Sequence, residues 1–296
     1  MRLPTFAVLG VGALLVGLTA ACGSPAGPAR DAAPTTGSPA TTGGRLLDGQ
    51  EKTFVFVGYS TSYRWPNILE LQLNRQFEDQ IVYHVMNAAE GGAPVGTWIA
   101  EPGTRDYQRS YERMLRDWFL PMPSRPDMQG RRRFPNVPAP TIALLQQSLQ
   151  LSTPLIQGPD DVENIRKGAD AMQALVERLH GDGVQLVFLT THIYKYTHEP
   201  EVEHEKYALA ELLSRKIPYL WPGPDVWTAT KARWPEVFTQ PDQVHLNRLG
   251  DGLDATLWYQ HLLRFDRGDL EPTLDSAWGP GWRQSVTLGE RKGTSE

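Results

Sequence analysis

Residues 54–65 read FVFVGYSTSYRW, and four of the first five are apolar. Such a run predicts a buried β-strand. The strand pattern ends abruptly at Gly58, so the small hydroxyl of Ser60 follows it almost directly. Two explanations are open at this point. Ser60 caps a helix after an ordinary turn, or the strand presents Ser60 as a nucleophile.

Working outward from this stretch, strand and helix patterns alternate along the chain. Strand patterns cover 53–59, 81–89, 141–147, 184–192 and 217–222, and helical patterns cover 65–79, 105–119, 160–180, 201–216 and 249–265. A Pro-rich stretch, 121–140, is interpreted as a surface insertion. The alternation predicts an α/β fold of three layers, doubly wound around a mostly parallel five-stranded sheet.

Charge argues against one class of partner. The 296 residues carry a formal net charge of -5. Nucleic-acid-binding domains present a basic face, so no nucleic-acid partner is expected. The one dense basic run, Arg131 to Arg133, is interpreted as a solvated loop.

The N-terminus has the features of an export signal. An apolar run from Phe6 to Leu18 is too short and Gly-rich for a membrane span. It leads into LTAAC, which resembles a bacterial lipobox with Thr19 in an atypical place, and Cys22 is the only cysteine. We expect a signal peptide at 1–21, then lipidated Cys22 with a disordered Pro/Gly-rich tether over 22–50. The alternative is an ordinary signal peptide with an incidental cysteine.

These boundaries leave one folded domain, 51–268, followed by a polar C-terminal tail, 269–296. A lipidated Cys22 implies an extracytoplasmic protein at a bacterial cell surface or in a periplasm, anchored to the membrane. No intramolecular disulfide is possible with a single cysteine, so the domain depends on its core.

A second motif near the end of the chain complements Ser60. In PDQVHLNRLG, Asp242 precedes His245 by three residues, just ahead of the last helical pattern. That spacing lets the carboxylate reach Nδ1 of the ring, which leaves Nε2 for a serine. Taken singly, Asp242 fits a turn residue and His245 fits a core histidine. Together with Ser60 they favour nucleophilic catalysis.

Three blocks of sequence resemble the SGNH (GDSL-type) hydrolases: Gly58-Tyr59-Ser60, the MNAAEGGAP segment 86–94, and DQVHLNRLG. The resemblance implies a flavodoxin-like fold and an esterase with Ser60 as nucleophile, His245 as base and Asp242 orienting the ring. It also implies oxyanion donors from the N–H groups of Ser60 and of Gly91 or Gly92.

Two blocks depart from the family pattern. Tyr59 stands where Asp or Asn is usual, and ALLQQSLQ contains no asparagine where the family has an oxyanion donor. We expect the amide of Gln146 to replace that asparagine, with its neighbour Gln147 as the choice if the register differs by one residue.

Further residues are assigned by position. Tyr59, Trp98 and His192 are expected to line the substrate site. The histidines 192, 198 and 204 match no tight ligand spacing, so neither a metal nor another cofactor is expected.

The expected function is hydrolysis of an acyl or acetyl ester on a small molecule, carbohydrate or lipid. The alternative is a non-catalytic lipoprotein of the same fold that binds a glycan or a protein partner.

Overall fold

The computed structural model describes residues 45–78, 80–101, 103–105, 111, 138–149, 154–199 and 202–286. The expected signal peptide, Cys22 and most of the tether lie outside the described residues. So do most of the helix expected at 105–119 and of the Pro-rich stretch 121–140.

Five parallel strands form a single sheet in the order β2-β1-β3-β4-β5. Their bounds are β1 Lys52–Gly58, β2 Tyr83–Asn87, β3 Ile142–Gln146, β4 Leu186–Thr190 and β5 Leu220–Pro222. The predicted α/β architecture with a five-stranded parallel sheet is confirmed. The chain reverses its direction of winding at β1, which lies between β2 and β3, and open α/β sheets bind ligands beyond such a switch point.

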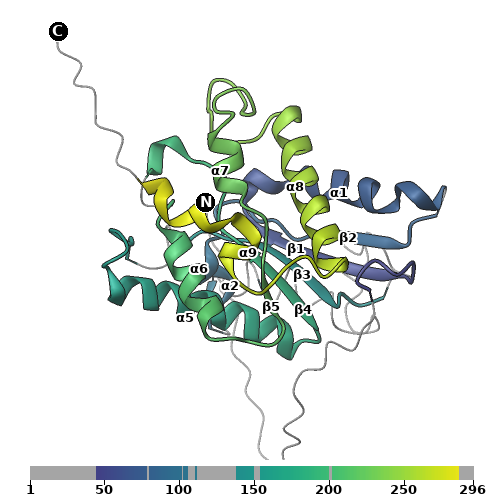
Figure 1. Ribbon diagram of the computed structural model, residues 1–296, viewed down its shortest axis with the longest axis horizontal. Helices are drawn as coiled ribbons and strands as arrows, with labels where there is room; N and C mark the ends of the chain where they lie inside the picture. The colour runs from purple at the N-terminus through teal and green to yellow at the C-terminus, as the bar shows by residue number, and fades with distance from the viewer. Residues whose placement is uncertain are drawn as a thin grey trace, which may run out of the picture. The chain divides into compact units, whose positions relative to one another are not determined.

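Helices cover both faces of the sheet (Figure 1). The longer described helices are α1 Trp65–Asn74, α5 Val162–Gly181, α6 Glu205–Ser214 and α8 Arg248–Asp266, and the shorter ones are α2 Val95–Trp98, α7 Val226–Lys231 and α9 Leu274–Trp278. Short 3₁₀ segments are η1 Ser60–Ser62, η2 Arg75–Phe77, η6 Tyr196–His198 and η7 Pro280–Val286. Among the described residues, no helix is both long and apolar enough to cross a bilayer.

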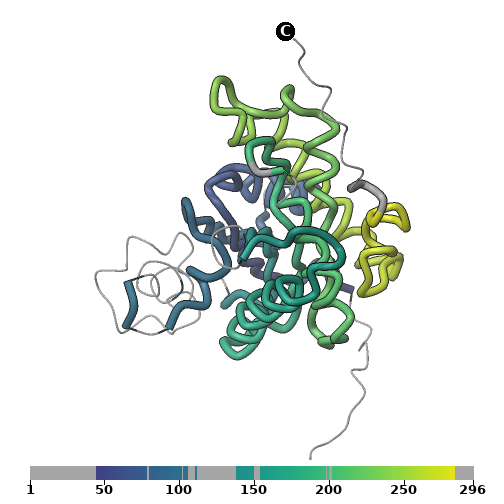
Figure 2. The backbone as a smooth tube through the Cα atoms, turned by 90° about the vertical axis from the view of Figure 1, so that its left-hand side faces the viewer, coloured from purple at the N-terminus to yellow at the C-terminus, as the bar shows by residue number. Residues whose placement is uncertain are grey.

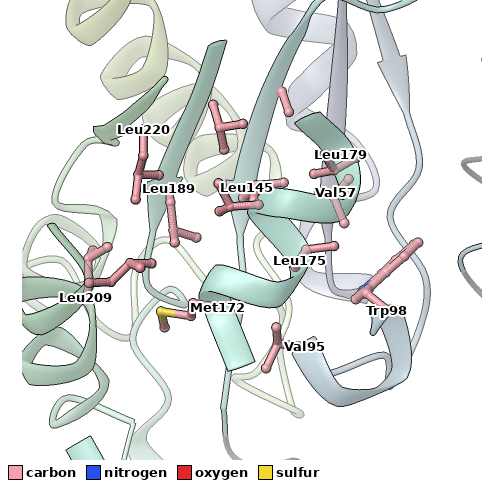
Figure 3. Packing of buried hydrophobic residues seen from close by; sticks show 14 of the residues in the cluster. Val57, Val95, Trp98, Leu145, Met172, Leu175, Leu179, Leu189, Leu209 and Leu220 are labelled. Carbon is pink, nitrogen blue, oxygen red and sulfur yellow. The ribbon is translucent and has the colours of Figure 1, made fainter. Parts of the chain in front are cut away.

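The side chains of β1 point alternately to the two faces of the sheet, and each face has its own hydrophobic core. Phe54 and Phe56 pack with α1 and α8 on one face, whereas Val55 and Val57 pack with α5 and α6 on the other. Successive side chains of a strand point to opposite faces, and a parallel sheet covered on both sides buries both sets. Figure 3 shows the second core, where side chains from the strands meet those of α2, α5 and α6.

The folded part extends beyond both expected boundaries. Leu46 is buried against the α1 and α8 side, within the range 22–50 that the sequence predicts as a disordered tether. In the expected polar tail, Leu274 and Trp282 are buried in the α5 and α6 core. The tail is polar on average, but these apolar residues occur in helical turns that turn them inward.

Candidate active site

Ser60 lies at the carboxyl end of β1, as the first residue of η1. Gly58 brings β1 close to its neighbour there. A Cβ on Gly58 would stand 2.5 Å from the Phe56 ring and 3.1 Å from the Gln146 carbonyl oxygen. A side chain at position 58 would therefore push the strands apart just before the serine.

His245 and Asp242 belong to the loop between α7 and α8, the light green segment at the top of Figure 2. Phe238 and Leu246 form an antiparallel bridge that holds the two sides of the loop together. Beside it, the Thr239 N–H donates to the His245 carbonyl at 2.8 Å. Asn247, two residues after His245, caps α8 by accepting from two of its N–H groups. The loop is thus fixed at both sides of the histidine.

The structure brings Ser60, His245 and Asp242 together. Ser60 Oγ lies 3.1 Å from His245 Nε2, and His245 Nδ1 lies 3.0 Å from Asp242 Oδ2. The ring and the carboxylate are 44% and 48% exposed, so the pair is open to a ligand from solvent. These contacts have the order serine, imidazole, carboxylate that nucleophilic catalysis requires.

The Asp242 carboxylate is held in its ionised form. Its other oxygen accepts from the Thr239 hydroxyl and from the Val244 N–H. These hydrogen bonds, with that to His245, lower the pKa of Asp242 well below its ordinary value. The Thr239 hydroxyl contributes most, and the carboxylate remains an acceptor for the imidazole at acidic pH.

Gly91 approaches Ser60 from the loop after β2. A Cβ built on Gly91 would lie 3.8 Å from Ser60 Cβ and 2.9 Å from the Tyr63 hydroxyl. The same construction on Gly92, whose φ is +63°, meets nothing within 4 Å. Of the two glycines left open by the sequence, Gly91 is the one whose position adjoins Ser60.

Gln146 does not lie as expected. Its side chain is fully buried on the α8 side of the sheet, where Nε2 donates to Asp254 Oδ2 at 3.2 Å and Oε1 accepts from Trp258 Nε1 at 3.1 Å. Both polar ends of the amide are therefore occupied by α8. This arrangement contradicts the expectation that Gln146 donates into the site, and the physical reason is the demand of a buried carboxylate for a donor.

Asp254 is the carboxylate concerned. Burial raises its pKa to about 7, against a lowering by the Gln146 hydrogen bond, and nearby Asp251 raises it further. Burial also raises the pKa of Asp251 to about 6. Two buried acids one helical turn apart therefore lie on the helix that follows His245.

Gln147, on the opposite face, is also fully buried, and neither end of its amide has a hydrogen-bond partner in the described part of the chain. It comes directly after β3, and its backbone N–H donates to the Thr190 carbonyl. Gln147 is therefore the glutamine whose side chain is not already used by another element.

The three expected substrate-lining residues are all buried. Trp98 is 0% exposed in the α5 and α6 core, and its indole N–H donates to the Ala93 carbonyl. It does not line a groove, because the four-residue helix α2 turns it inward. Tyr59 and His192 pack edge to face at 5.2 Å, and His192 Nε2 lies 3.3 Å from the hydroxyl of Thr61, the residue after Ser60. They pack against each other and against the residue that follows Ser60.

Glu205 is a supporting residue that the sequence patterns did not single out. It begins α6, is 2% exposed, and its Oε1 accepts from the Ser148 hydroxyl and the Leu149 N–H, both at 2.8 Å. The segment that it holds follows β3, where the resemblance expects an oxyanion residue. The sequence offers only a glutamate within the predicted helix 201–216, and a glutamate near a helix start is ordinary.

The histidine-rich segment does not form a metal centre in the described residues. No group of three or more His, Cys, Asp or Glu side chains there is arranged to hold a metal ion. His204 Nδ1 instead lies 2.8 Å from the Ile156 carbonyl oxygen. His204 therefore acts in packing the start of α6.

Comparisons with known proteins give neighbours in structure only. No family model and no curated protein matches the chain. Among solved structures, a carbohydrate esterase family 3 protein from Talaromyces cellulolyticus is 8% identical, with a TM-score of 0.46 over 73% of this chain and 99% of that one. An acetylxylan esterase from Geobacillus stearothermophilus is 11% identical, with a TM-score of 0.47 over 72% of this chain and 95% of that one.

A lipase/acylhydrolase from Enterococcus faecalis is 14% identical, with a TM-score of 0.43 over 76% of this chain and 99% of that one. Such identities and TM-scores assign no activity.

Proposed function

We propose that this protein is a serine hydrolase that cleaves an acyl or acetyl ester of a carbohydrate or lipid. The observation that carries the proposal is the pair of contacts from Ser60 Oγ to His245 Nε2 and from His245 Nδ1 to Asp242. The serine contacts a base and the base contacts a carboxylate. Ser60 is 185 positions away from His245 in the chain.

In the first half-reaction, Ser60 Oγ forms a bond to the ester carbonyl carbon and passes its proton to His245 Nε2. The carbonyl electron pair moves to the oxygen, which becomes an oxyanion. When that pair returns, the bond to the alcohol breaks, and the alcohol leaves with the proton from His245. Asp242 stabilises the imidazolium throughout.

In the second half-reaction, a water molecule gives its proton to His245 and attacks the acyl-Ser60 carbonyl carbon. Collapse of the new oxyanion releases the acid and returns the proton to Ser60 Oγ. The N–H groups of Ser60 and Gly91 are proposed as oxyanion donors, since Gly91 adjoins Ser60. No step requires a metal or an organic cofactor.

A fluorophosphonate probe with a panel of acetyl, butyryl and longer-chain esters tests this proposal. The wild-type protein should be labelled at Ser60 and should hydrolyse at least one ester. Ser60→Ala should abolish both while leaving thermal unfolding unchanged, because Ser60 faces the site and not either core. Unchanged turnover in Ser60→Ala would exclude Ser60 as the nucleophile.

A binding lipoprotein remains the second candidate, favoured by one observation. Gln146, expected to complete the oxyanion hole, is occupied by Asp254 and Trp258. A folded wild-type protein that is neither labelled nor active on any ester would support the binder.

We further propose export and anchoring through lipidated Cys22. The support is the LTAAC sequence after a short apolar run and the Pro/Gly-rich segment that follows it. The enzyme would then act at a bacterial surface or in a periplasm, at a distance from the membrane set by the length of the tether.

A further inference from the structure

The 3₁₀ turn that carries Ser60 places a second hydroxyl beside it. In a 3₁₀ helix, side chains three residues apart lie one above the other. Ser60 begins η1, and Tyr63 closes it with helical angles, φ -69° and ψ -22°. The turn therefore sets Tyr63 on the same side as the proposed nucleophile.

Gly91 connects the two hydroxyl residues in space. A Cβ at that one position would contact both the Tyr63 hydroxyl, at 2.9 Å, and Ser60 Cβ, at 3.8 Å. The Tyr63 hydroxyl thus lies against the glycine whose N–H group we propose as an oxyanion donor. This close approach also gives a reason for glycine at position 91, where a methyl group would displace the phenol.

The backbone of Tyr63 is fixed from β2. Asn87 Nδ2 donates to the Tyr63 carbonyl at 3.0 Å and to the Ser62 carbonyl at 3.3 Å, while Asn87 Oδ1 accepts from the Ala89 N–H at 2.9 Å. One side chain therefore ties η1 to the loop that contains Gly91. Tyr63 remains 51% exposed, so its side chain is accessible from solvent next to Ser60.

We propose that the Tyr63 hydroxyl is a catalytic hydrogen-bond donor to the oxyanion formed at Ser60, and this inference rests on the hydrolase function proposed above. Gln146 is occupied by α8, so the site lacks the side-chain donor expected there. A phenol donates its O–H to an oxyanion without transferring the proton. The bond strengthens as charge develops on the oxygen, which lowers the barrier and leaves ground-state binding little changed.

Tyr63→Phe tests the proposal, because it deletes one oxygen from an exposed ring. Loss of one oxyanion donor typically lowers turnover about 100- to 1000-fold. We expect a fall of that order in kcat for acetyl and butyryl esters alike, with KM changed by less than about threefold. Phenylboronic acid, which forms a tetrahedral adduct with a serine, should bind more weakly by a comparable factor.

Tyr196→Phe is the matched control. Tyr196 begins η6 and is 42% exposed, and its hydroxyl is assigned no part in the reaction. Both variants should melt at the wild-type temperature. Gln147→Leu is the second comparison, because the unused amide of Gln147 is the rival donor.

The hydrolase function and the role of Tyr63 are tested separately by these experiments. If the wild-type protein hydrolyses esters and Tyr63→Phe keeps near-full kcat, the assignment of Tyr63 is overturned while the hydrolase stands. A fall in kcat with Gln147→Leu alone would move the donor to Gln147. A change in KM alone would make Tyr63 a substrate contact. A wild-type protein without activity or labelling would overturn both.

Discussion

At the scale of single residues, Gln146 hydrogen-bonds a buried carboxylate and so does not donate into the candidate active site. Its amide satisfies the Asp254 carboxylate and the Trp258 indole at the same time. Buried polar groups without hydrogen-bond partners cost folding free energy, so these two hydrogen bonds stabilise the folded protein. The role that follows for Gln146 is structural.

Gln146→Leu should therefore destabilise the protein. Removing the amide leaves the buried Asp254 and Trp258 without these partners, at a cost of about 1–3 kcal/mol for each group. Urea unfolding measures the loss. Turnover of the remaining folded protein should fall little, and Gln147→Leu should unfold close to wild type. A stable but inactive Gln146→Leu would restore Gln146 to the oxyanion hole.

Several residue positions were predictable, and others were not. Ser60, Asp242 and His245 could be named because the fold rule for strand ends and a short motif identify such residues from sequence. Trp98 and Tyr63 could not be placed. A four-residue helix has too little periodicity to show which way Trp98 points, and a single 3₁₀ turn leaves no pattern that marks Tyr63. The choice between Gln146 and Gln147 depended on which face α8 covers.

At the scale of elements, the start of α6 supports the segment after β3. Glu205 accepts from the Ser148 hydroxyl and the Leu149 N–H, so one carboxylate joins α6 to the loop that follows β3. Strand and helix patterns were visible in the sequence, but this connection depends on how two separate patterns meet. The bounds of β3 and α6 could be predicted to within a few residues, whereas their hydrogen bonds could not.

Glu205→Ala should loosen this connection. The change removes one buried acceptor from two hydrogen bonds, and we expect a loss of about 2–4 kcal/mol in unfolding free energy. Glu205→Gln keeps an oxygen acceptor at the same reach and should lose much less. Hydrogen exchange of the Leu149 amide should quicken in Glu205→Ala alone. Equal losses in the two variants would show that the charge matters more than the hydrogen bonds.

At the scale of the whole molecule, buried Asp254 makes stability depend on pH. Its pKa in the folded protein is about 7, because burial disfavours the charged form. An unfolded aspartate titrates near about 3.9. Between these values the folded protein holds more protons than the unfolded chain, so this group lowers stability as pH rises from about 4 to 7.

Asp254→Asn should remove the Asp254 part of that dependence, while Asp251, whose pKa burial raises to about 6, keeps its own part in both proteins. Relative to wild type, the variant should gain on the order of 1–3 kcal/mol in unfolding free energy between pH 5 and pH 8. His261, whose pKa burial lowers to about 4, contributes the opposite slope below about pH 6.5, and it does so in both proteins. Urea titrations at several pH values measure the difference. Parallel pH profiles would show that Asp254 is not the group responsible.

The proposed anchor is also tested on the whole molecule. Cys22→Ala should move the protein from the membrane fraction to the soluble fraction, because the lipid is the proposed attachment. A Ser24→Ala variant, two residues further on, should remain with membranes. If Cys22→Ala still sediments with membranes after a salt wash, the protein is held there in another way.

The contact between Ser60 and His245 spans 185 positions of the chain. A growing polypeptide therefore completes β1 and Ser60 long before Asp242 and His245, the residues proposed to activate it, have been made. Closing so long a loop requires the sheet to assemble first, since distant contacts form late when the intervening chain is disordered. Chains interrupted before His245 would carry a serine without its proposed base, so activity would report that synthesis had passed His245 and that the sheet had folded.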